Sequence, residues 1–168
     1  MILRVQKRDL FFSSNSARIL KPHDVDLSEV FHLIKSSFAF MAGRIDPPSS
    51  IDRLTPEKLF KMAEVGSVVV LGKPVIACVV VTAIPHAMYL GKMAVDPSVR
   101  GQGAARALVE ACNTIALDHG VACLELKVRI ELLENQRVFT RIGFVKTSEH
   151  CHPGYDEVTE ITMQRRVR

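Results

Sequence analysis

The stretch Val95-Asp96-Pro97-Ser98-Val99-Arg100-Gly101-Gln102-Gly103-Ala104-Ala105-Arg106 carries most of the information about the fold. A strand is predicted to end at its start, and a helix to begin near Gly103. The first amides of a helix have no partner within that helix, and Gly101 and Gly103 have no Cβ to keep a ligand away from the main chain. The stretch therefore predicts a phosphate site formed by backbone N–H groups and the positive end of the helix dipole, to which Arg100 and Arg106 could add charge.

Two other phosphate-binding motifs fit the same stretch less well. A P-loop requires Gly-Lys-Ser/Thr before its helix, and this tripeptide is missing here. The dinucleotide fingerprint G-x-G-x-x-G/A would place Arg106 at its sixth position, and five residues separate Val95 from Gly101 although that motif follows its strand directly. A glycine-containing loop that merely enters a core helix stays open as an alternative, as does a nucleotide-dependent oxidoreductase that would bind NAD tightly.

The hydrophobic spacing on either side of this stretch predicts alternating strands and helices. Runs rich in valine and isoleucine, or with a period of two, predict strands at 17–21, 67–71, 75–82, 87–95, 122–129, 144–149 and 159–166. Apolar residues at helical spacing predict helices at 24–38, from Thr55 onward, at 103–119 and at 131–142. One loop-like stretch, 43–53, has two prolines at its centre. This order predicts an α/β fold of the mixed α+β kind, with helices on both faces of the sheet.

Length and composition exclude several classes of protein. The chain has 168 residues, which predicts a single domain, 1–168, with 1–16 as a flexible start. Its 48% hydrophobic and 24% charged residues exclude a disordered chain. The longest apolar run, 75–83, is far shorter than the ~20 residues needed to cross a bilayer, so no membrane partner is expected. The net charge of +4 is scattered, which favours an anionic small ligand over nucleic acid.

The cysteines predict neither a disulfide framework nor a metal site. They form no C-x-x-C pair, and they are Cys78, Cys112, Cys123 and Cys151. This usage fits a reducing cytosol, so we expect a cytoplasmic protein. His150 and His152 would share one side of an extended segment, but structural zinc needs four ligands, so we predict no bound metal.

Two parts of the sequence resemble the signatures of a known family. The pattern R-x-x-G-x-A at 100–105, after a strand and Asp-Pro, resembles the coenzyme A pyrophosphate loop of the GNAT superfamily of N-acetyltransferases, Arg/Gln-x-x-Gly-x-Gly/Ala. The stretch 134–144, a helix that ends in Gly-Phe, resembles the second family signature, and the resemblance covers 17–167. It implies a GNAT-like fold with a central, mostly antiparallel, twisted sheet of six to seven strands, about four helices on its two faces, and splayed strands 4 and 5.

The resemblance also implies where acetyl-CoA would bind. Main-chain groups of 93–95 would pair with the pantetheine and with the acetyl carbonyl, and a backbone donor of this kind is worth ~3 kcal/mol or more. The amides of the glycine loop would hold the pyrophosphate, and a helix side chain would touch the pantetheine or phosphate arm. The implied acetyl-CoA-binding residues are Met93, Ala94, Val95, Arg100, Gly101, Gln102, Gly103, Ala104, Ala105 and Asn135.

The expected base departs from the family pattern. Direct attack by an amine on the acetyl thioester needs a neutral amine, so a side chain must take its proton. Many family members carry a Glu on the fourth strand, whereas 88–93 of this chain contains no acid. We therefore predict Glu125, on the polar face of the fifth strand, as the catalytic base, with Glu131 as an alternative.

The expected acid departs from the family pattern as well. Family members often use a tyrosine four residues before the Gly of Gly-Phe, and this chain has Phe139 there. A phenyl ring has no proton to donate. We predict that Tyr155 acts as the catalytic acid instead, with His150 or His152 as alternatives, while solvent could also protonate the thiolate.

Together these residues predict an N-acetyltransferase that moves an acetyl group from acetyl-CoA to a primary amine of a small molecule or peptide in a ternary complex. The alternative is a non-catalytic domain of the same fold that senses acyl-CoA, since the usual acid and base are missing. A homodimer is expected because small sheet proteins of this family commonly pair. The acceptor is not predicted, although Lys92 beside the site would repel cationic amines, pair with an acidic substrate, or face solvent.

Overall fold

The computed structural model describes Phe12 and residues 16–168. The flexible start predicted at 1–16 therefore lies almost entirely outside the described residues. The strands are β1 (Arg18–Leu20), β2 (Ser67–Leu71), β3 (Ala77–Ile84), β4 (Ala87–Val95), β5 (Cys123–Arg129), β6 (Val145–His150) and β7 (Glu160–Arg166). The α-helices are α1 (Leu27–Phe38), α2 (Pro56–Val65), α3 (Ala104–Asp118) and α4 (Leu133–Ile142), and 3₁₀ turns occupy Ala39–Met41, Ser50–Arg53 and Pro97–Val99.

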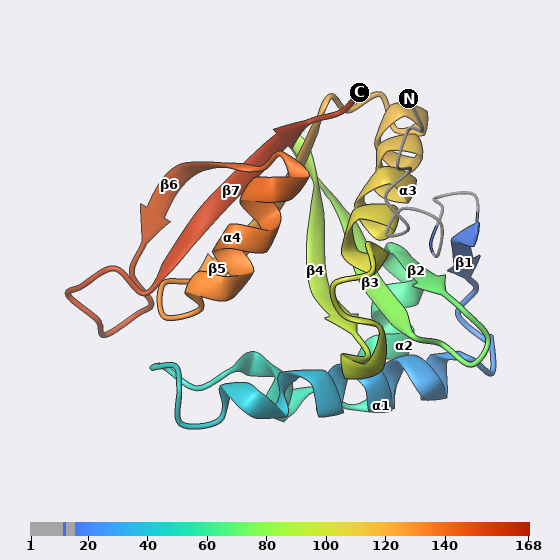
Figure 1. The fold of residues 1–168 in the computed structure, drawn as a ribbon, viewed down its shortest axis with the longest axis horizontal. Helices are drawn as coiled ribbons and strands as arrows, with labels where there is room; N and C mark the ends of the chain where they lie inside the picture. Colours follow the sequence, from blue (N-terminus) through green and yellow to red (C-terminus); the bar gives the residue numbers. More distant parts are fainter. Residues whose placement is uncertain (1–11, 13–15) are drawn as a thin grey trace, which may run out of the picture.

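In the described part of the chain, seven strands form one sheet in the order β1-β2-β3-β4-β5-β7-β6. Neighbouring strands run antiparallel, except that β4 and β5 run parallel. α1 and α2 pack on one face, and α3 and α4 pack on the other (Figure 1). The predicted mixed α/β fold, its order of elements and its sheet covered on both faces are thereby confirmed.

The centre of the sheet is buried on both faces because β2 and β3 are nearly continuous runs of valine. Successive side chains of a strand point to opposite faces, so Val69 and Val79 join the core under α3, while Val68 and Val80 join the core under α1 and α2. The two strands thus serve two cores at once. The turn between them needs Gly72, whose φ is +82° and whose missing Cβ would lie 2.8 Å from the carbonyl oxygen of Pro74.

The sheet splits between β4 and β5. The described residues of the two strands pair at Met88 with Leu124 and at Tyr89 with Glu125, and beyond these pairs the strands diverge (Figure 1). The predicted splay of strands 4 and 5 is confirmed. The segment that follows α1 lies beneath the open end of the gap.

A β-bulge bends β4 beside the gap. Cys78 of β3 pairs with Ala94 and Val80 pairs with Gly91, so that Lys92 and Met93 together oppose a single residue of β3. Lys92 has φ +51°, a left-handed conformation that non-glycine residues rarely adopt. The bulge turns the end of β4 away from β5.

Two arginine contacts fix α3 relative to the β5–β7 half of the sheet. The guanidinium of Arg165 on β7 is buried, with 4% of its side chain exposed, and its Nη2 lies 2.6 Å from Oε1 of Glu110 on α3. Arg106, at the start of α3, donates from Nη2 to the carbonyl oxygen of Arg141 near the end of α4. The second contact holds the Arg106 guanidinium against the end of α4, and the expectation that Arg106 adds charge to the phosphate site stays a prediction.

Two helices begin later than the hydrophobic spacing predicts, at Leu27 instead of 24 and at Leu133 instead of 131. The carboxylate of Asp24 accepts the N–H of Asp26, and this local turn competes with the helix.

The described residues contain no helix that is both long enough and apolar enough to cross a bilayer.

We expect Glu110→Gln to lower the free energy of unfolding by about 2 kcal/mol, because a buried guanidinium that loses its carboxylate keeps its desolvation cost. The matched control is Glu149→Gln, which removes the exposed ion pair of Glu149 with Lys146 and should change stability by about 0.5 kcal/mol or less. Denaturant unfolding measures both. Equal losses in the two variants would contradict the assigned role of Arg165.

Candidate active site

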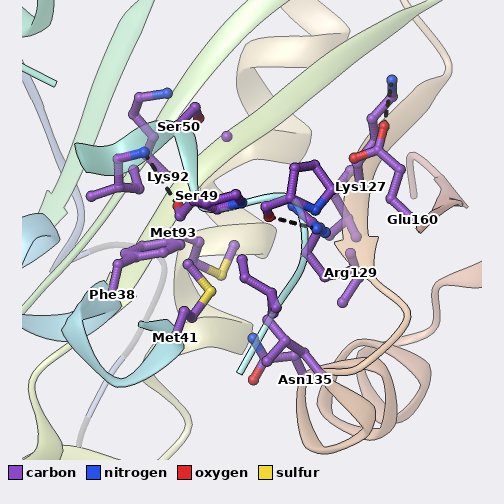
Figure 2. A pocket seen from close by; sticks show the side chains of 18 of the residues that line it. Phe38, Met41, Ser49, Ser50, Lys92, Met93, Lys127, Arg129, Asn135 and Glu160 are labelled. Atoms are coloured by element: carbon purple, nitrogen blue, oxygen red, sulfur yellow. Dashed lines mark hydrogen bonds and ion pairs between the residues drawn. The ribbon is translucent and has the colours of Figure 1, made fainter. Parts of the chain in front are cut away.

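A cavity of about 620 Å³ occupies the gap between β4 and β5. Its walls come from β4, β5, the start of α4, the segment after α1, and the connection between β6 and β7 (Figure 2). Charged and polar side chains line it together with aromatic and methionine side chains, and its polar lining residues include Ser49, Ser50, Asp52, Arg53, Tyr89, Lys92, Lys127, Arg129, Asn135, His152 and Glu160. A wall that combines apolar surface with converging polar groups is typical of a small-molecule site.

The loop before α3 presents free backbone donors beside this gap. None of the backbone N–H groups from 101 to 106 donates a hydrogen bond to another described residue, and the first amide bonded within the helix is that of Ala107, which donates to Gly103. Gly101 and Gly103 have φ +73° and +88°, and a Cβ on Gly101 would meet nothing within 4 Å. The N-terminus of α3 therefore offers unpaired N–H donors and the positive end of the helix dipole, which together suit an anion.

Side chains of the same loop hold its shape. Arg100 Nε donates to the carbonyl oxygen of Val95 at 3.2 Å, and Gln102 Nε2 donates to that of Ser98 at 3.3 Å. The carboxylate of Asp96 accepts the N–H of Ser98 at 2.8 Å, and hydrogen bonds from the hydroxyl and N–H of Ser98 lower the pKa of Asp96. Arg100 and Gln102 thus support the loop, while Ala104 and Ala105 form the first turn of α3.

The predicted main-chain contacts on β4 divide between its two sides. The N–H of Asp96 donates to the carbonyl oxygen of Ile76, and Ala94 pairs with Cys78, so the backbone groups of Ala94 face β3. Met93 and Val95 alternate with it and face the gap. Because the Val95 carbonyl already accepts from Arg100, the Val95 N–H is the group that stays available there.

The start of α4 contributes Asn135 and Phe139 to the cavity. Its neighbour Gln136 donates from Nε2 to the carbonyl oxygens of Arg129 and Ile130, which ties α4 to the end of β5. Phe139 packs edge-on against Phe144 with ring centroids 5.9 Å apart. Asn135 is therefore placed at the cavity wall by the contacts of two side chains that follow it on α4.

The structure does not bring Glu125 to the cavity. It lies where β4 and β5 are still paired, and it is not among the lining residues. Its Oε2 lies 3.0 Å from His86 Nε2 and accepts from Gln164 Nε2 at 2.7 Å. Burial acts to raise its pKa, but these hydrogen bonds and the charges of His86 and Lys127 outweigh burial, so the pKa is lowered. A carboxylate held in this way is a weak base, and the role predicted for Glu125 stays a prediction.

Tyr155 lies at the rim of the cavity, outside its lining residues. Its hydroxyl donates to the carboxylate of Asp46. This hydrogen bond, with some burial and the negative charge of Asp46, raises the pKa of Tyr155 against the opposing effect of Arg129. Tyr155 thus joins the β6–β7 connection to the segment after α1, and its predicted role as an acid also stays a prediction.

Sequence reasoning missed a group of charged residues at the cavity. Lys127 Nζ lies 3.2 Å from Glu160 Oε1, and the two side chains point toward one another in Figure 2. Burial and the charges of Glu160 and Glu125 raise the pKa of Tyr89. The alternation of β5 signalled that Lys127 and Arg129 share a face, but no local signal placed Glu160 opposite Arg129 on β7.

Lys92 and Cys78 occupy the two sides of the bulge. Lys92 lines the cavity without an ion pair to any described residue, and its burial lowers its pKa. Cys78 lies behind the bulge with Sγ 4.0 Å from the Lys92 carbonyl oxygen, and burial raises the pKa of its thiol to about 12.

In the part of the chain that the structure describes, no group of three or more His, Cys, Asp or Glu side chains is placed to hold a metal ion.

Solved acetyltransferases share this fold. Ard1 from Thermoplasma volcanium is similar with a TM-score of 0.69 and 20% identity, over 90% of this chain and 97% of the other. The ribosomal-protein-S18-alanine N-acetyltransferase from Escherichia coli is similar with a TM-score of 0.62 and 20% identity, over 90% of this chain and 94% of the other. A chain of the NatC complex bound to Gag peptide and CoA is similar with a TM-score of 0.64 and 21% identity, over 90% of this chain and 98% of the other. A search of curated protein sequences finds no match.

The similarity to these structures shows the fold, and the sequence shows the family. The sequence pattern of the acetyltransferase (GNAT) family matches residues 27–144. The chain belongs to this family, as its two signature-like stretches predicted.

We expect both tyrosines of the chain, Tyr89 and Tyr155, to ionise above pH 10 in the folded protein. The ultraviolet absorbance of tyrosinate measures this, and the chain has no tryptophan to obscure it. Asp46→Asn removes the negative charge that disfavours the Tyr155 phenolate. It should therefore lower the pH at which Tyr155 is half ionised and leave that of Tyr89 unchanged. A midpoint at or below pH 10 in the folded wild type would contradict the assigned contacts.

Proposed function

We propose that the protein is an acetyl-CoA-dependent N-acetyltransferase, a single acetyltransferase domain that moves an acetyl group to a primary amine by direct attack in a ternary complex. The observation that carries the proposal is the gap between β4 and β5, which holds the lined cavity, together with the free amides in the loop that follows β4. If the diphosphate of coenzyme A bound at those amides, its pantetheine arm would extend into the gap. The family of the chain supports this reading.

The residues present fit acetyl-CoA. The pyrophosphate would be bound by the backbone N–H groups of 101–106, where a phosphate meets donors and the helix dipole without a Cβ from Gly101 in its way. The pantetheine would lie along the gap-facing backbone of Met93 and Val95, with Asn135 at its other side. When bound, acetyl-CoA supplies the activated acyl group as a thioester.

The chain's own groups would then assist the transfer. The free N–H of Val95, or that of Met93, would donate to the thioester carbonyl oxygen and stabilise the negative charge that develops there; such a donor is worth ~3 kcal/mol. Phe139 offers no proton, so the departing thiolate would take one from solvent or from the attacking amine. Phe38, Met41 and Phe139 line the cavity and would place apolar surface beside the thioester.

The acceptor would enter from the side of the β6–β7 connection and the segment 43–53. Similar structures include an enzyme named for the alanine of a ribosomal protein and a complex bound to a peptide. A peptide amine is therefore one acceptor class for this chain, and a small-molecule amine is the other.

The test is an assay of thiol release with acetyl-CoA and a panel of amines that contains peptides with free N-termini, lysine side chains and small amines. We expect release that depends on both substrates, with acetylated amine identified by mass spectrometry. Binding of coenzyme A without transfer to any amine class would instead support the non-catalytic acyl-CoA sensor. Failure to bind coenzyme A would contradict both.

We expect Gly101→Val to weaken the binding of coenzyme A at least about tenfold, because a branched side chain would crowd the phosphate that approaches the loop. Gly120→Val is the matched control at the other end of α3. Both glycines have positive φ, +73° and +68°, and open space where the Cβ would be, so both variants carry a similar backbone cost of about 1 kcal/mol. Calorimetric titration measures the Kd, and equal affinities in the two variants would contradict the phosphate site.

Two further expectations accompany this function. A cytoplasmic location is supported by the four cysteines, all of which are free thiols. A homodimer is supported by β6, an edge strand whose Val145 is exposed. Light scattering on the purified protein measures the mass in solution, and a monomer at micromolar concentration would contradict the second expectation.

A further inference from the structure

The connection between β6 and β7 brings one of two neighbouring histidines to the cavity. His152 lines the cavity, and 29% of its side chain is exposed. His150, two residues earlier, is not a lining residue, and its Nε2 lies 2.8 Å from Thr162 Oγ1 and 3.0 Å from Ser148 Oγ. The two rings therefore have different surroundings although they are close in sequence.

Thr159 fixes the ring of His152. The Thr159 hydroxyl oxygen accepts the backbone N–H of His152 at 2.9 Å, contacts Nδ1 of its ring, and donates to the carbonyl oxygen of His150 at 3.3 Å. A hydroxyl has one proton. When the Thr159 proton is directed at that carbonyl, Nδ1 carries the ring proton and donates to Thr159. In this tautomer Nε2 is the unprotonated nitrogen of the neutral ring.

A carboxylate stands near that nitrogen. Nε2 lies 3.8 Å from Glu160 Oε2, a distance that is too long for a hydrogen bond but short enough to stabilise an imidazolium. The other oxygen of Glu160 is paired with Lys127 at 3.2 Å, and 18% of the Glu160 side chain is exposed. The pair with Lys127 holds the Glu160 carboxylate in place. His152, Glu160 and Lys127 all line the cavity.

The charges around the ring come from three further elements. Arg129 on β5 donates from Nε to the Thr159 carbonyl oxygen and from Nη2 to that of Pro47, which places its positive charge beside the residue that contacts the ring. Tyr155, whose N–H donates to the His152 carbonyl oxygen, and its partner Asp46 lie on the other side. Tyr89 approaches from β4, where its pKa already responds to Glu160. Glu160 is the carboxylate within 4 Å of the ring.

We propose that His152 accepts the proton of the incoming ammonium at Nε2, directly or through one water, with Glu160 and Lys127 as positioning residues. The proposal rests on the proposed function. The ammonium gives one proton to Nε2, and the neutral amine attacks the thioester carbon. The C–N bond forms and the C–S bond breaks; sulfur leaves with the electron pair of that bond and takes the second proton of the nitrogen. The imidazolium then returns its proton to solvent.

His152 suits this step better than the carboxylates nearby. An imidazole exchanges its proton near neutral pH, where an alkyl ammonium must be deprotonated, whereas a carboxylate is a much weaker base. Glu125 is bound by two partners outside the cavity. Asp52, the other acidic lining residue, is exposed on the 3₁₀ turn at Ser50–Arg53.

The first test compares His152→Gln with His150→Gln. Loss of a general base should lower kcat by about 100-fold or more in His152→Gln, with the Kd of coenzyme A unchanged. In wild type, kcat should rise with pH as the imidazole loses its proton, and this rise should disappear in His152→Gln. In a second variant, His152→Ala, added imidazole should restore part of the rate. His150→Gln should stay within about twofold of wild type. A kcat within threefold of wild type for His152→Gln, or a retained rise with pH, overturns the proposal.

The second test asks whether Glu160 acts through the ring. Glu160→Gln removes the charge that stabilises the imidazolium, so the rise of kcat should move to lower pH, and kcat at high pH should fall less than in His152→Gln. An unmoved rise would overturn the role of Glu160.

A third measurement does not depend on turnover. Long-range ¹H–¹⁵N NMR of the free protein should find the neutral His152 ring protonated at Nδ1, and a ring protonated at Nε2 would overturn the assignment. An active wild type with an equally active His152→Gln overturns this inference alone. A wild type that binds coenzyme A but acetylates no amine overturns the proposed function and this inference with it.

Discussion

The parting of β4 from β5 is the constraint on which the rest of the molecule depends. Parallel strands normally satisfy each other's backbone groups along their whole length, and a buried group without a partner costs about 1–3 kcal/mol. Here the described residues pair at two positions and then separate. The bulge at Lys92 bends one strand away, and Met41, which follows α1 on one side of the sheet, packs into the core of the other side. The separation is thus built into the packing, and it leaves backbone groups that only a ligand or water can satisfy.

The elements and the unpaired amides at the start of α3 could be predicted because both depend on short-range patterns. Valine runs identify β2 and β3, and two glycines before a helix expose its first amides whatever surrounds them. The proton-transfer residues could not be predicted in this way. The alternation of β5 places Glu125 and Lys127 on one face, but which of them borders the gap depends on the register with β4 and β7. Tyr155 likewise contacts a residue 109 positions away, which no local pattern encodes.

The segment after α1 is attached to the half of the sheet that lies across the gap. Arg129 donates to the Pro47 carbonyl oxygen, and Glu131 accepts the N–H of Asp46 at 3.1 Å. With the Tyr155 hydroxyl, these contacts connect the floor of the cavity to β5 and to the β6–β7 connection. The width of this side of the cavity therefore depends on a few polar contacts instead of on the apolar core, and sequence changes among them would alter the cavity without disturbing the sheet.

The burial of Cys78 has a consequence for the proposed transfer of an acetyl group. A thioester exchanges readily with a thiolate, so a reactive cysteine beside the gap would be acylated by the donor and would compete with the amine. Cys78 lies just behind the bulge, but its pKa of about 12 keeps it a thiol, and the β4 main chain stands in front of it. If acetyl-CoA binds in the gap as proposed, this burial would prevent the acylation of Cys78.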